Sequence, residues 1–142
     1  MGCGCDSGSG GCSCLGNGGG VPSPRGERII EFFPRPTTLI ATQAGTLYYS
    51  DPADVTEYKT LTIEVVELAS LGDGVLLETW IETGFDLANW ATLGANFNPP
   101  SVGSIVAVRT DPARHVRHVV KATSVAAAGL VVMWSRAVAR RQ

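Results

Sequence analysis

Four cysteines stand near the start of the chain, and none follows in the remaining residues. They form two Cys-x-Cys pairs, a spacing that allows disulfides, a soft-metal site built from thiolates, or free thiols. A bond within one Cys-x-Cys pair would close a small, strained ring, so each cysteine is expected to bond to another segment. We predict disulfides, mainly between chains, because a flexible arm can reach a neighbour. These residues are Cys3, Cys5, Cys12 and Cys14.

The segment that carries the cysteines has no means of folding alone, because up to residue 21 it holds only Leu15 and Val21 as large apolar side chains apart from Met1. We therefore divide the chain into a Gly/Cys-rich arm (1–20), a Pro-rich linker (21–37) and a β-sandwich domain (38–142). The prolines of the linker disfavour a helix and favour extended chain. Its isoleucines and phenylalanines are apolar enough to dock on the domain.

The domain is predicted to be all-β, because short alternating segments separated by turns follow one another without a helical period. The clearest alternation lies in 58–68 and 75–83, on either side of the hairpin signal Asp73-Gly74. About eight strands at regular spacing predict an antiparallel β-sandwich of the jelly-roll type.

Composition limits the partners of the chain. The hydrophobic content of 44% supports a core, while a charged content of 17% and a net charge of −2 argue against binding nucleic acid through a basic surface. No apolar run of about 18 residues occurs, so no membrane partner is expected. We also expect no cofactor.

The charges are segregated along the sequence. Nine acidic residues and one lysine lie in 51–86, and seven basic residues and one aspartate lie after residue 108. Two interpretations stay open: the charges pair across strands of one sheet, or acidic and basic faces meet between subunits. The candidates for an intersubunit contact are Glu78, Glu82, Arg136, Arg140 and Arg141.

No catalytic residues emerge from the sequence, and we expect no enzyme. His115 and His118 would point to opposite faces of a strand, and Glu78 and Glu82 would share a solvated face. The tryptophans are expected in the core or at a subunit interface. Trp80, on the face that carries the glutamates, is the best alternative candidate for stacking on a sugar.

Three stretches carry a resemblance: Asp54-Val-Thr-Glu-Tyr-Lys-Thr-Leu-Thr-Ile-Glu-Val, the segment 77–94, and Arg114-His-Val-Arg117. Together they resemble small jelly-roll proteins of tailed-phage virions and, more distantly, discoidin-like and carbohydrate-binding sandwiches. The resemblance covers about residues 38–140 and implies a non-enzymatic protein located in the virion. It would decorate the capsid or belong to the head or tail, as a homo-oligomer in contact with other virion proteins. A carbohydrate-binding module and a thiolate metal-binding accessory protein are the alternatives.

Overall fold

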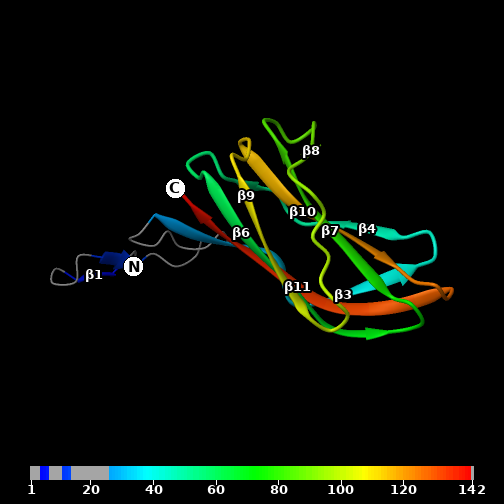
Figure 1. The fold of residues 1–142 in the computed structure, drawn as a ribbon. Helices are drawn as coiled ribbons and strands as arrows, with labels where there is room; N and C mark the ends of the chain where they lie inside the picture. Colours follow the sequence, from blue (N-terminus) through cyan, green and yellow to red (C-terminus); the bar gives the residue numbers. More distant parts are fainter. Residues whose placement is uncertain (1–3, 7–10, 14–25, 142) are drawn as a thin grey trace.

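Strands dominate the protein in a computed structural model, which describes residues 4–6, 11–13 and 26–141 (Figure 1). No helix occurs within these ranges. The first two strands pair with each other, and the other nine form one curled sheet. In chain order the strands are β1 (Gly4–Asp6), β2 (Gly11–Ser13), β3 (Glu27–Thr42), β4 (Thr46–Tyr49), β5 (Ala53–Asp54), β6 (Thr60–Leu71), β7 (Leu76–Gly84), β8 (Ala91–Thr92), β9 (Ser104–Thr110), β10 (His115–Thr123) and β11 (Ala128–Arg140).

The curled sheet consists of two four-stranded layers. One layer has the order β4-β10-β7-β8, with β5 extending the pairing of β10, and the other has the order β3-β11-β6-β9. A single parallel pair, Thr123 with Thr42, joins them. Eight strands in two layers, with the chain crossing between the layers, are the arrangement of a jelly roll. The predicted fold class is confirmed.

Strand β3 begins inside the segment that the sequence suggested was a linker. It pairs with β11 from Glu27 onward, and its side chains Ile30, Phe32 and Leu39 are buried. Pro34 and Pro36 lie where the register between β3 and β11 shifts, so their missing N–H groups fall at an irregularity of the ladder. Residues 27–37 therefore belong to β3, while the division of the whole chain into arm, linker and domain stays a prediction.

The core fills the space between the two layers, and alternate residues of each long strand supply it. In β6 and β7 the residues predicted to face inward are buried, whereas the glutamates of β7 face outward. The largest apolar side chains buried there include Leu61, Ile63, Ile81, Met133 and Val131.

Two polar side chains hold the crossover between β8 and β9 in place. Arg109 on β9 donates from Nε to the carbonyl oxygen of Leu93, at 2.9 Å, and from Nη2 to that of Ala95. Glu67 on β6 is only 3% exposed, and its carboxylate accepts a hydrogen bond from the backbone N–H of Val102. These contacts fix a connection that has almost no regular structure of its own.

Candidate binding site on the outer face of β7 and β10

An ion pair lies at the centre of the outer face of β7 and β10. Arg117 and Glu82 stand opposite each other in the strand register, and Arg117 Nη2 is 2.7 Å from Glu82 Oε1. Arg117 Nε also donates to the same oxygen, at 2.8 Å. The two side chains are 23% and 18% exposed, so water screens this pair less than a pair at the rim.

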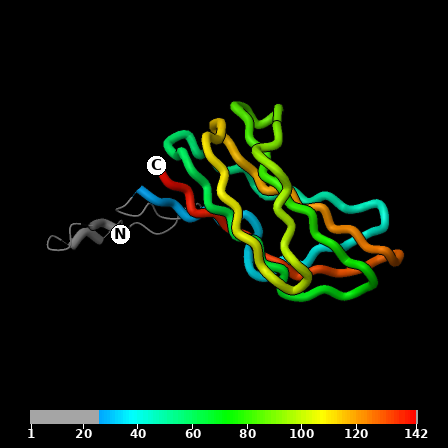
Figure 2. The backbone as a smooth tube through the Cα atoms, in the orientation of Figure 1, coloured from blue at the N-terminus to red at the C-terminus, as the bar shows by residue number. Residues whose placement is uncertain are grey.

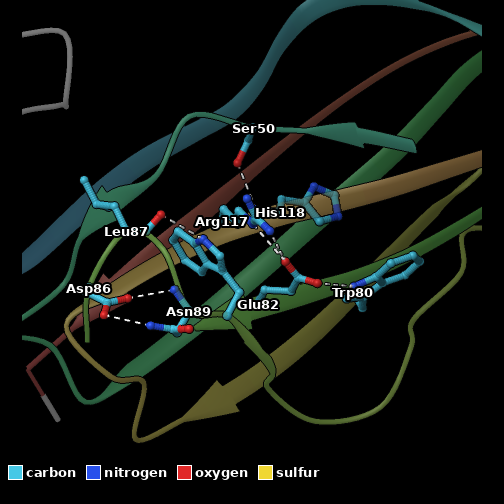
Figure 3. Close-up of polar contacts among 9 residues, drawn as sticks. Ser50, Trp80, Glu82, Asp86, Leu87, Asn89, Arg117 and His118 are labelled. Atoms are coloured by element: carbon cyan, nitrogen blue, oxygen red, sulfur yellow. Dashed lines mark hydrogen bonds and ion pairs between the residues drawn. The ribbon is translucent and has the colours of Figure 1, made fainter. Parts of the chain in front are cut away.

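Aromatic side chains surround this pair. The Arg117 guanidinium carbon lies 4.4 Å from the ring centre of Tyr49 and 4.3 Å from that of Trp90. Glu82 Oε2 accepts a hydrogen bond from Trp80 Nε1, at 3.3 Å (Figure 3). Cation–π contacts of this kind contribute on the order of 1 kcal/mol each when partly shielded from water. Strands β4, β7 and β10 and the loop after β7 thus meet at one cluster.

The loop between β7 and β8 is organised by Asp86. Its Oδ1 accepts hydrogen bonds from the backbone N–H groups of Ala88 and Asn89, at 3.0 and 2.7 Å, and its Oδ2 accepts one from Asn89 Nδ2, at 3.0 Å (Figure 3). The bonds from Asn89 and Ala88 lower the pKa of the Asp86 carboxyl. Trp90 Nε1 donates to the carbonyl oxygen of Leu87, at 3.3 Å. This network gives the loop a defined shape although it is exposed.

Gly84 at the start of this loop has a steric role. A Cβ placed there would lie 2.2 Å from the backbone oxygen of Asn89. The loop therefore folds back onto the end of β7 at a position that only glycine leaves open.

An open hollow of about 340 Å³ lies beside the loop. Phe85 and Trp90 supply aromatic walls, Asp86 and Asn89 supply polar groups, and Ala113 closes the side that faces the β9–β10 turn. The Phe85 side chain is 83% exposed. The site is thus a shallow depression with aromatic and hydrogen-bonding groups at its surface.

The predicted interface residues find partners within the chain. Glu82 pairs with Arg117, and Glu78 lies opposite Lys121 in the strand register. The three C-terminal arginines pair with glutamates that are distant in sequence: Arg136 with Glu64 at 3.2 Å, Arg140 with Glu27 at 3.0 Å and Arg141 with Glu57 at 2.9 Å. The charges thus pair across strands within the chain, as the first of the two interpretations expected. The contact between subunits stays a prediction.

The cysteines lie at the margin of what the structure describes. The register of β1 and β2 sets Cys5 opposite Cys12, while Cys3 and Cys14 lie outside the described residues. The predicted interchain disulfides therefore stay a prediction. Within the described ranges, no group of three or more His, Cys, Asp or Glu side chains is placed to hold a metal ion. The described residues also include no helix of the length and apolarity needed to cross a membrane.

His118 lies in the core, whereas His115 is partly exposed. The His118 ring packs among Phe32, Phe33 and Phe97, with ring centres 5.7, 5.5 and 5.8 Å away, and its Nδ1 is 2.8 Å from Ser135 Oγ. Burial lowers its pKa from 6.5 to about 3. Among the described residues, Ser135 is the side chain hydrogen-bonded to the ring, and His118 is part of the buried core.

The cluster of Tyr49, Trp80, Glu82, Trp90 and Arg117 was only partly visible in the sequence. Trp80 was singled out, and it does lie on the outer face of β7 beside Glu82. Tyr49 and Arg117 were missed, because they come from strands whose pairing with β7 a local pattern does not reveal. A usable signal was present in Phe-Asp-Leu-Ala-Asn-Trp, where two aromatics flank an Asp-x-x-Asn turn.

Several solved structures of similar fold belong to virus particles. The chain aligns with the VP2 subviral particle of infectious bursal disease virus with a TM-score of 0.55 and 15% identity, over 80% of this chain and 33% of the viral chain. It aligns with T=1 particles derived from the same virus with a TM-score of 0.54 and 13% identity, over 96% and 35% of the two chains. The Gt strain of the virus gives a TM-score of 0.53 and 14% identity, over 96% and 37%.

This chain spans about a third of the length of the viral chains that it matches. At these identities the likeness establishes a shared fold. No protein-family model and no curated protein matches the chain.

Proposed function

We propose that this chain is a non-enzymatic structural protein of a virus particle, specifically a capsid-decorating or other head–tail component of a tailed phage. Its N-terminal cysteines would cross-link neighbouring copies. The observation that carries the proposal is the fold of the nine-stranded curled sheet, which is similar to that of proteins from infectious bursal disease virus particles.

Two features of the described residues support a structural role. The polar side chains with long-range contacts, such as Glu67 and Arg109, hold loops and strands together. Charged side chains of β3, β6 and β11 form ion pairs across the sheet. These hydrogen bonds and ion pairs stabilise the fold of one subunit. Its function would then depend on the surfaces through which it contacts other chains.

The cysteines support assembly of such blocks. In the chain-entropy model, a bond that closes a long loop stabilises an assembly by on the order of 3 kcal/mol or more. A variant with serine at all four positions should therefore keep the fold while its assembly loses resistance to heat. Wild-type protein should also migrate as a ladder of oligomers on a gel without reductant, and as one band with reductant.

The experiment uses the full chain in two forms, wild type and the four-serine variant. Light scattering measures the size of the assembly. Immunogold labelling of phage particles from cells that make the protein tests whether the protein is located in the particle. Identical melting of the two assemblies would exclude cross-linking. Bound zinc or another soft metal in stoichiometric amount would favour the thiolate alternative. Failure of the antibody to label particles would contradict the virion location.

A further inference from the structure

The loop between β7 and β8 displays apolar side chains that the fold does not need for its core. Phe85 is 83% exposed and Leu87 is 60% exposed, at adjacent positions around Asp86. Large apolar side chains gathered at one exposed place mark a surface that meets a ligand or another molecule. The hydrogen bonds to Asp86 hold this loop in shape, so the exposure belongs to a structured surface.

The orientation of the Trp90 ring is set by contacts with residues that do not line the hollow. Arg117 stacks on the ring at 4.3 Å, and the Trp90 indole N–H is bonded to Leu87. Arg117 is not among the residues that line the hollow, whereas Trp90 is. The ion pair with Glu82 in turn holds the arginine. A ligand in the hollow would thus meet an aromatic wall whose orientation is already set, which reduces the ordering cost of binding.

The polar side chains that line the hollow retain hydrogen-bonding positions that a ligand could use. The three hydrogen bonds that Asp86 accepts within the loop use three of about four lone-pair positions on its carboxylate. Asn89 donates one of its two Nδ2 protons to Asp86, and its side-chain oxygen is also an acceptor. The two aromatic faces can pack against the C–H groups of a saturated ring. The carboxylate and the amide can form hydrogen bonds with hydroxyl groups at the edge of that ring.

The charge and the volume of the hollow limit the kinds of ligand that it could bind. None of the described residues that line the hollow is basic, and Arg117, which stacks on Trp90 from outside it, is paired with Glu82. Its volume of about 340 Å³ lies at the lower end of the range for small-molecule sites. Both observations favour a small neutral ligand.

We propose that the β7–β8 loop binds a neutral pyranose ring, with Phe85 and Trp90 as stacking walls and Asp86 and Asn89 as hydrogen-bonding partners of the hydroxyl groups. The saccharide would be the exposed end of a larger glycan. This site is independent of the proposed particle function, because the binding belongs to one loop of one chain.

The test is saturation-transfer NMR on the full chain with a panel of methyl glycosides of glucose, galactose, mannose and N-acetylglucosamine, and with sialic acid as the acidic comparison. We expect transfer to the ring protons of at least one neutral glycoside. We also expect Phe85→Ala and Asn89→Ala each to weaken its binding by about tenfold, which is about 1.4 kcal/mol.

Leu87→Ala is the matched control, because Leu87 is exposed in the same loop but does not line the hollow. It should leave glycoside binding unchanged, and all three variants should melt like the wild type. The inference is overturned if no neutral glycoside shows transfer, if sialic acid alone does, or if Leu87→Ala weakens binding as much as Phe85→Ala. It is also overturned if Phe85→Ala abolishes self-association instead, which would make the loop a contact between copies.

Discussion

The buried histidine should make the fold sensitive to mild acid. His118 is fully buried, and its Nδ1 is bonded to Ser135, while Nε2 has no hydrogen-bond partner among the described residues. A neutral ring with its proton on Nδ1 leaves only a lone pair unmatched at Nε2. Protonation would place an N–H group and a positive charge there, among phenylalanine rings, and this is why burial lowers the pKa to about 3.

The magnitude follows from the two pKa values. Unfolded chains bind the proton at 6.5 and the folded chain only near 3, so the unfolded state holds more protons between these values. The free energy of unfolding therefore falls as the pH falls through this window. From about pH 7.5 to about pH 5 the loss is about 2 kcal/mol, a large part of the 5–15 kcal/mol typical of a domain.

Urea unfolding followed by tryptophan fluorescence, with reductant present, measures this loss at several pH values. Phe in place of His118 together with Ala in place of Ser135 removes the ionisable ring and its partner at once. This double variant should lose less than about 0.5 kcal/mol over the same window. His115→Gln, which changes the only other histidine, should keep the wild-type loss. An equal loss in the wild type and in the double variant would refute the assignment to His118.

Three further predictions concern stability and assembly. Glu67→Ala should cost about 2 kcal/mol of unfolding free energy in urea, because it removes the charged acceptor of the part-buried hydrogen bond from the Val102 N–H; a cost below about 0.5 kcal/mol would contradict this. Deletion of residues 1–20 should leave a cooperative thermal melt in calorimetry, since the core lies beyond them, and a broad melt would be the contrary result. Reversal of Arg140 and Arg141 to glutamate should cost under about 1 kcal/mol for each exposed pair. If the predicted intersubunit contact forms, the reversal should also slow assembly, and the assembly rate of the wild type should fall as salt rises. An assembly rate that the reversal leaves unchanged over a wide range of salt would rule out that contact.

Local periodicity was enough to predict the faces of the long strands. Residues 61, 63 and 65 and residues 77, 79 and 81 are buried, because side chains in a strand alternate between two faces and only one face meets the core. Strand β3 was less predictable. Pro34 and Pro36 are typical of a linker, yet β3 accommodates them at the irregular register opposite β11, at the edge of its layer.

The candidate site depends on contacts that no local pattern contains. Arg117 and Glu82 are 35 residues apart, and only the antiparallel pairing of β10 with β7 brings them together. Tyr49 joins them because β4 pairs with the other edge of β10. Trp80 was predictable as an outward-facing residue, but its neighbours were not, since they follow from the order of strands in the layer.

The pairing of Glu27 with Arg140 places the start of β3 beside the end of β11 (Figure 2). This neighbourhood has a mechanical consequence for any cross-linked arm. A tension between residues 27 and 140 would peel β3 from β11 one hydrogen bond at a time, because both attachment points lie at the same end of the ladder. A tension between residue 27 and the far end of β11 would instead shear the whole sixteen-residue strand at once. In a particle that applies tension in this second direction, the force needed to separate β3 from β11 would rise with the length of β3.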